Sequence, residues 1–127
     1  MKENNKLIAE FIGVKPKDKD WYDGYELHKA GLPFAYGAMG NGTNDLKFYE
    51  SWDWLMPVVD KIDKLVMRNK DWFMVSIGSF HTSIFRKNKL GHPYFDEEIN
   101  IDVNDNKLLR TYKAVVEFIK WYNKNKK

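Results

Sequence analysis

Three histidines are the side chains of this sequence best suited to proton transfer near neutral pH: His28, His81 and His92. Imidazole ordinarily changes charge between about pH 5 and 8, and it is also a common metal ligand. None of the three occurs in HExxH or at another spacing that places two ligands on one helix face. A metal or hydrolytic site would therefore have to be assembled from separate loops, and surface turn positions are the simpler interpretation of His81 and His92.

The other polar motifs do not fit a catalytic or ligand-binding pattern. Asp18, Asp20 and Asp23 suggest a calcium-binding loop. Such a loop requires glycine at its sixth position and glutamate at its twelfth, where this sequence has Asp23 and Lys29. The glycines of GAMGNG, residues 37–42, lack the GxGxxG order and the Lys-Ser/Thr of a phosphate loop. We therefore predict no catalytic residue, no cofactor and no metal, and a protein that is not an enzyme.

Aromatic residues close to lysines are the remaining candidates for function. Trp21, Tyr22 and Tyr25 follow a lysine-rich stretch over residues 15–19, and they could stack unpaired nucleic-acid bases beside a basic groove. The formal net charge is only +3, from 21 basic and 18 acidic residues, so core aromatics rimmed by lysines are the simpler interpretation. Aromatic residues also commonly anchor protein interfaces. A candidate partner surface is predicted at Trp21, Tyr22, Tyr25, Tyr36 and Trp54.

The composition is that of an ordinary folded protein. The chain has 127 residues, of which 43% are hydrophobic, and this predicts one domain, residues 1–127, with its own core. There is no cysteine, which excludes disulfides and thiolate metal ligands and fits a reducing compartment. The N-terminal stretch MKENNKLIAEFIGVK has only a short apolar run, so neither a signal peptide nor a membrane span is predicted. The expected location is the cytoplasm.

Hydrophobic periodicity predicts the elements that position these residues. Helices are predicted over residues 4–12, 52–66 and 107–123. Strands are predicted over residues 21–27, with an interruption at Asp23-Gly24, and over residues 46–49, 71–77, 82–86 and 99–103. The glycine-rich residues 28–45 and the polar residues 87–98 are predicted as loops, and the first of these is the segment most expected to carry function.

The connections between strands predict the fold class. Residues 71–86 form a strand, a turn and a strand, and so short a connection favours antiparallel pairing. The sequence DWFMVSI, residues 71–77, is apolar on both sides of the strand, a pattern typical of a strand covered on both faces. We therefore predict an α+β fold with a mainly antiparallel sheet of about four or five strands and three helices, layered α/β/α.

The sequence SWDWLMPVVDKI, residues 51–62, is conspicuous for its two tryptophans and its internal proline. Because proline inside a helix removes a backbone hydrogen bond, the helix is predicted either to start near Asp53 or to kink at Pro57. Trp52 extends the apolar stripe of the helix and is expected in the core. Trp54 lies off that stripe and is expected to be partly exposed.

Three segments of the chain resemble a known group of proteins. They are NNKLIAEFIG at residues 4–13, SWDWLMPVVDKI at residues 51–62 and YKAVVEFIKWYN at residues 112–123. In this order they resemble small uncharacterised proteins encoded by phages, prophages and mobile elements of Bacteroides-type gut bacteria, and they are similar to the phage ABA sandwich domain family. The resemblance implies α/β/α layering and a phage-related context, but no activity, cofactor or catalytic residue.

These observations leave three hypotheses for function. The first is a small phage- or mobile-element-associated accessory protein that acts through protein–protein contacts, with an unknown protein as its partner. The second is a single-stranded nucleic-acid binding module that uses the aromatic and lysine residues near the N-terminus. The third is a loop-built hydrolase or nuclease site at His28, His81 or His92, which requires two of these histidines, or one histidine and a carboxylate, to converge in a pocket.

Overall fold

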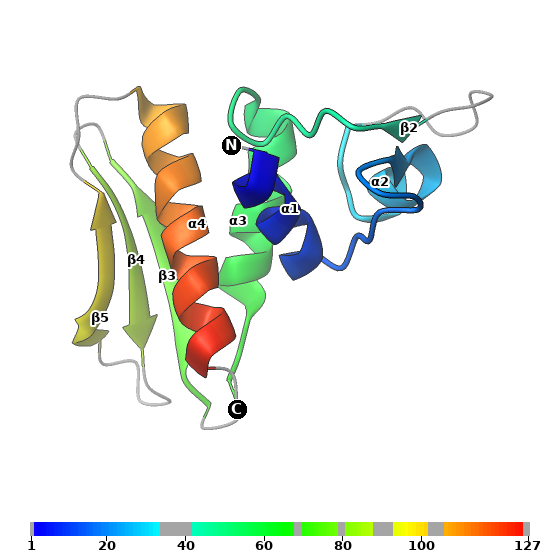
Figure 1. Ribbon diagram of the computed structural model, residues 1–127. Coiled ribbons are helices and arrows are strands. Elements are labelled where there is room, and N and C mark those ends of the chain that lie inside the picture. The colour runs from blue at the N-terminus through cyan, green and yellow to red at the C-terminus, as the bar shows by residue number, and fades with distance from the viewer. Residues whose placement is uncertain are drawn as a thin grey trace.

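The chain folds into four helices and five strands within the residues that the structure describes, as a computed structural model shows (Figure 1). The described residues are 2–33, 42–67, 70–78, 81–87, 93–101 and 106–125. The elements are α1 (Lys2–Phe11), β1 (Tyr22–Asp23), α2 (Gly24–Lys29), β2 (Gly42–Thr43), α3 (Trp52–Lys64), β3 (Trp72–Ile77), β4 (Thr82–Lys87), β5 (Pro93–Ile101) and α4 (Lys107–Asn125). The predicted mixture of helices with antiparallel strands is confirmed.

The strands form two separate sheets rather than the single sheet of four or five strands that was predicted. β3, β4 and β5 form an antiparallel sheet in that order, and β1 pairs with β2 in a ribbon two residues long. The ribbon is short because the chain turns into α2 directly after Asp23. The strand predicted over residues 21–27 is therefore mostly a short helix, which buries Gly24 and Leu27 on one face.

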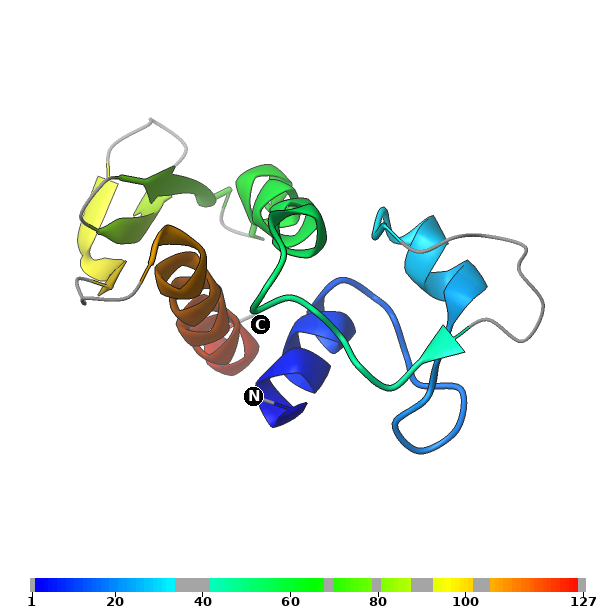
Figure 2. The ribbon, with the colours of Figure 1, turned by 90° about the horizontal axis from the view of Figure 1, so that it is seen from above.

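The helices lie on one side of the three-stranded sheet, so the predicted α/β/α layering is wrong for the described residues (Figures 1 and 2). α4 packs on β4 and β5, α3 packs on β3, and α1 contacts α4 on the side away from the sheet. Phe73 and Ile84 face the helices and are buried, whereas Met74 on the opposite face is 37% exposed. The apolar run over residues 71–77 thus reflects apolar residues on an uncovered outer face, not a second helix layer.

The outer edge of β3 is covered by a side chain of α3. The Val75 backbone N–H donates a hydrogen bond to Asp63 Oδ1, over 3.1 Å. An edge strand presents unpaired backbone donors that invite pairing with other chains. Asp63 satisfies one such donor and helps to fix the position of α3 against the sheet.

α3 begins at Trp52, the first residue of the predicted range 52–66 and one residue before the alternative start at Asp53, and Pro57 lies inside it. The two tryptophans also take the opposite positions to those expected, because Trp54 is 5% exposed while Trp52 is only half-buried. Trp54 lies one turn before Val58 on the buried stripe of the helix, and its ring meets the ring of Phe48 edge-on with 5.4 Å between centroids. Phe48 comes from the preceding loop, because the strand predicted over residues 46–49 does not form. The prediction for Trp54 was wrong because it overlooked the (i, i+4) spacing of Trp54 and Val58.

The second half of the chain follows the prediction more closely. The β3–β4 hairpin is confirmed, and α4 is capped as expected, since the Leu109 N–H donates to Asn106 Oδ1 over 2.8 Å. β5 starts at Pro93, within the predicted loop over residues 87–98. None of the helices in the described part of the chain is both long and apolar enough to span a membrane.

Candidate functional site

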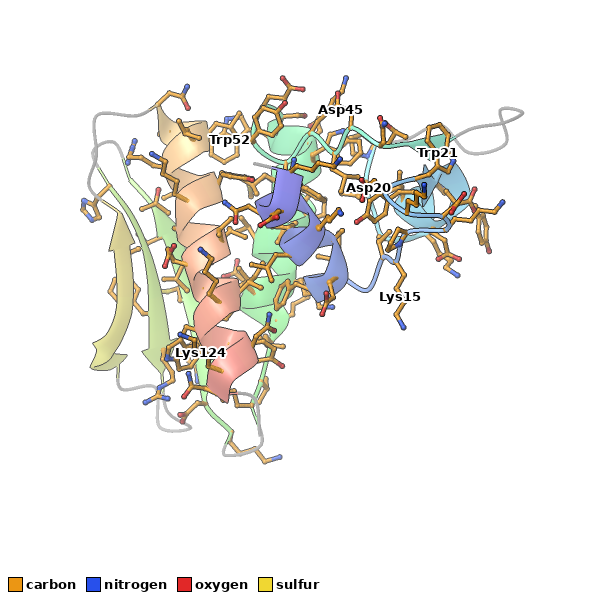
Figure 3. All side chains as sticks on the ribbon, viewed as in Figure 1. Lys15, Asp20, Trp21, Asp45, Trp52 and Lys124 are labelled. Carbon is orange, nitrogen blue, oxygen red and sulfur yellow. The ribbon has the colours of Figure 1, made fainter. Side chains whose placement is uncertain are left out.

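The predicted partner surface is only partly at the surface. Trp21 and Tyr25 are 41% and 46% exposed, whereas Tyr22 and Trp54 are 2% and 5% exposed and belong to the core. Tyr36 lies outside the described residues. The candidate surface is thereby reduced to Trp21 and Tyr25, which both lie in the peripheral lobe formed by β1, β2 and α2, on the far side of the helices from the three-stranded sheet (Figures 1 and 3).

Trp21 is held in a fixed position although its side chain is exposed. Its backbone N–H donates to the Asp18 carbonyl and its carbonyl accepts from the Lys17 N–H, both over 2.7 Å. Lys19, inside this turn, has a φ of 47°, a left-handed conformation that is strained for a residue other than glycine. The indole lies directly against Gly42 of β2, where an added Cβ would stand only 2.4 Å from the indole Nε1. Gly42 is therefore the residue that makes room for Trp21.

Replacing Gly42 by alanine is expected to displace the Trp21 indole while leaving the fold intact. The new methyl group cannot occupy the same space as the indole, and the exposed ring can swing outward more easily than the backbone can move. The measurement is the indole N–H signal of Trp21 in NMR spectra, which should shift strongly in Gly42→Ala. The corresponding signals of the buried Trp54 should not move, and an unchanged Trp21 signal would contradict the expectation.

Tyr25 lies on the exposed face of α2 with a cation beside its ring. Lys29 Nζ is 5.0 Å from the Tyr25 ring centroid and 3.5 Å from Glu26 Oε2. These are (i, i+4) and (i, i+3) pairs along one helix face, so they hold Tyr25 against its own helix. The second exposed aromatic thus also has a restricted position.

The lysines near the N-terminus do not form a basic groove beside these aromatics. Lys15 points away from Trp21, and the two side chains lie at opposite ends of the peripheral lobe (Figure 3). Lys15 and Lys17 instead line a cleft of about 430 Å³ together with Asp23 and Glu26. Cations mixed with carboxylates attract a polyanion weakly. Lys15 and Lys17 therefore line a cleft of mixed charge rather than a basic groove.

The two histidines that the structure describes do not converge. His28 lies in α2 and His81 directly precedes β4, and these elements lie at opposite sides of the molecule (Figures 1 and 2). Both side chains are exposed, and His92 lies outside the described residues. Across the described ranges, no three side chains among His, Asp and Glu gather closely enough to hold a metal ion.

A cleft that sequence reasoning missed lies between α1 and the segment that follows β2. Its volume is about 300 Å³, and its lining residues come from three separate segments. They are Lys2, Asn5, Lys6, Asp20, Tyr22, Asn44, Asp45, Leu46 and Tyr49. The only local signal in the sequence is the (i, i+4) spacing of Lys2 and Lys6, which places both ammonium groups on one face of α1.

One end of the cleft carries an ion triple. Lys2 Nζ is 2.8 Å from Asp20 Oδ2, and Lys6 Nζ pairs with the other carboxylate oxygen. Hydrogen bonds from the two ammonium groups lower the pKa of Asp20 from 3.8 to about 2. The hydrogen bond to Asp20 likewise raises the pKa of Lys6. The triple joins the peripheral lobe to the first turns of α1.

At the bottom of the cleft, buried hydrogen bonds connect α1, the segment after β2 and α4. Asn5 is 6% exposed, donates from Nδ2 to the Leu46 carbonyl over 2.9 Å, and accepts at Oδ1 from the Tyr112 hydroxyl over 3.0 Å. Burial raises the pKa of Tyr112 to about 12, and the charge of Glu50 is the main cause of the raised pKa of Tyr49. The hydrogen bonds of Asn5 hold the floor of the cleft in place.

Replacing Asp20 by asparagine is expected to remove an acid-sensitive part of the stability. Because the pKa of Asp20 is lowered by folding, its ion pairs stabilise the protein above pH 3.8, and this contribution is lost as the pH falls toward 2. At low salt, the wild type should therefore have a higher melting temperature than Asp20→Asn near pH 3.8, and the two should have the same melting temperature near pH 2. Asp60→Asn, at an exposed position of α3, is the control. A constant difference at all pH values would contradict the expectation.

The comparisons with known proteins identify no class for this chain. No family model, no curated protein and no solved structure matches it. The function must therefore be inferred from the two features above, the exposed aromatics of the peripheral lobe and the cleft beside α1.

Proposed function

We propose that the protein acts by binding another protein, with Trp21 and Tyr25 of the peripheral lobe as the main contact residues. One observation carries the proposal: Trp21 is 41% exposed and yet packed in a fixed position on Gly42. A rigid exposed aromatic loses little conformational entropy when it is buried by a partner, and tryptophan and tyrosine contribute disproportionately to interface energies. Tyr25, restrained by Lys29, supports the same surface.

The resemblance of three segments to phage and mobile-element proteins gives this proposal a biological setting. In it, the protein is a small, non-catalytic accessory protein of the cytoplasm that acts in a complex. The exposed histidines of the described residues take no part in it. The partner is expected to present an apolar pocket, because both contact residues are aromatic.

The test is a pull-down from the producing cells with quantitative mass spectrometry. Trp21→Ala and Tyr25→Ala should each reduce recovery of the specific partner by about tenfold, a loss of 1.4 kcal/mol. Gly42→Ala retains both aromatic side chains but displaces one, so it should weaken recovery in the same direction. Val66→Ala, which truncates the most exposed apolar side chain described, at 58%, is the matched control.

The same variants separate this proposal from nucleic-acid binding. Purified wild-type protein is not expected to bind labelled single strands at low salt, because the cleft lined by Lys15 and Lys17 also carries the carboxylates of Asp23 and Glu26. Binding of single strands that is lost in Trp21→Ala would replace the proposal with the nucleic-acid hypothesis. A set of recovered proteins that is the same for wild type, Trp21→Ala and Tyr25→Ala would refute the proposed surface.

A further inference from the structure

The cleft beside α1 has no net charge but two opposite poles. Its ionisable side chains with full charge are two lysines and two aspartates, Lys2, Lys6, Asp20 and Asp45. Asp20 sits with the two lysines, so that end of the cleft is positive by one unit. Asp45 forms no ion pair with any described residue, and its charge contributes to the raised pKa of Tyr49. The end near Tyr49 is therefore negative.

Both poles can accept a further partner. The Lys2 and Lys6 side chains are 67% and 44% exposed, and each ammonium has three donors, of which Asp20 needs one. Asp45 is held in place by a short turn, in which its N–H donates to Thr43 Oγ1 over 2.9 Å. Both aspartates lie beside the N-terminal part of α1 (Figure 3). A ligand lying across the cleft could therefore meet charges of both signs.

Besides the buried amide of Asn5, two largely apolar side chains form the floor between the poles. Tyr22 and Leu46 line it and are 2% and 3% exposed. The Leu46 carbonyl already accepts a hydrogen bond from Asn5 Nδ2. A volume of about 300 Å³ is at the lower limit of ligand pockets, which restricts the ligand to a small molecule.

We propose that this cleft binds a free α-amino acid with an apolar side chain. The ligand carboxylate lies beside Lys2 and Lys6, the ammonium lies beside Asp45, and the side chain rests on Tyr22 and Leu46. An ion of one sign gains one pole but is repelled by the other, whereas a zwitterion is attracted by both. The inference is independent of the protein-binding proposal, because it uses neither Trp21 nor Tyr25.

The test is an NMR titration of the full-length, isotope-labelled protein with L-leucine as the probe. Saturable shifts are expected at the amide signals of residues 44–49, with a Kd of about 1 mM, since exposed ion pairs contribute modestly. Leucinamide lacks the carboxylate and N-acetyl-leucine lacks the ammonium, and each should bind about tenfold more weakly. Shifts that are absent with leucine, or equal for all three compounds, would overturn the proposal.

Two variants test which charged group of the ligand lies at each pole of the cleft. Asp45→Asn should weaken leucine binding about tenfold and leave the binding of N-acetyl-leucine unchanged, because only the ammonium site is lost. Lys2→Gln should weaken both leucine and N-acetyl-leucine while leaving leucinamide unchanged. Both positions are exposed, so folding is not at risk, and Asp60→Asn is the charge-matched control. Leucine binding by Asp45→Asn at the wild-type level would equally overturn the proposal.

Discussion

Replacing Phe118 by alanine is expected to lower the free energy of unfolding by about 3–5 kcal/mol, the typical loss for a buried phenylalanine. Phe118 is 1% exposed, and its ring lies 4.8 Å, between centroids, from Phe73 of β3. It also contacts the rings of Phe11 in α1 and of Trp121 and Tyr122 in α4, at 6.0–6.2 Å. Its removal therefore loosens the sheet, α1 and α4 together.

Urea unfolding followed by tryptophan fluorescence measures this effect. Phe118→Leu keeps most of the volume and should lose clearly less stability than Phe118→Ala. Met74→Ala removes an apolar side chain that is 37% exposed and should have a small effect. A loss below about 1 kcal/mol for Phe118→Ala would mean that the aromatic cluster collapses to fill the cavity.

Replacing Asp71 by alanine is expected to lower the free energy of unfolding by about 3–5 kcal/mol, because it leaves a cation without its carboxylate in a largely buried position. Asp71 Oδ2 is 3.7 Å from Arg86 Nε, and their side chains are only 6% and 17% exposed. The Arg86 guanidinium also lies 5.5 Å from the centroid of the Trp121 ring, so it joins β4 to α4. Without Asp71 the ion pair is lost, while the guanidinium charge stays in this largely buried position beside the Trp121 ring.

A double replacement distinguishes the charge effect from lost packing. Asp71→Leu combined with Arg86→Met removes both charges and keeps apolar volume, so it should recover most of the stability lost in Asp71→Ala. Lys120→Ala breaks the exposed pair with Glu117 and should leave stability unchanged within error. If the double variant is as unstable as Asp71→Ala, the loss comes from other contacts of these side chains.

Helices α1, α3 and α4 and the β3–β4 hairpin could be predicted because their sequence signals are local. In α3, Leu55, Val58, Val59 and Ile62 recur at helical spacing and are all buried. The start of α4 could be predicted from its N-cap at Asn106, and the turn between β3 and β4 from its short length. Each of these signals is contained within a few residues of the feature that it predicts.

The peripheral lobe could not be predicted because its structure depends on distant contacts. Residues 21–27 are rich in aromatic residues, as strands often are, but the chain turns into α2 directly after Asp23, so β1 pairs with β2 over only two residues. In this lobe the tertiary structure outweighs the local pattern. Trp54 is a different case, because its (i, i+4) spacing to Val58 already places it on the buried stripe of α3.

The cleft could not be found from sequence for the same reason. Lys2 and Lys6 meet Asp20 only because the fold brings the segment before β1 beside α1. Nothing in the sequence around either lysine indicates this partner. Asn5 looks like an ordinary polar residue near a helix start, yet it is buried and bonded to two distant residues. The spacing of Lys2 and Lys6 indicates one charged helix face but not its acidic partner.

The contact between α1 and α4 has a consequence for the order of synthesis. The hydrogen bond from Tyr112 to Asn5 joins residues 107 positions apart, so α1 leaves the ribosome long before its packing partner exists. Until α4 emerges, α1 lacks the helix that packs against it, and a helix of 10 residues is not stable alone. The core of this protein is therefore completed only after α4 has been made, and ribosome-bound chains that stop before α4 should remain open to protease at α1.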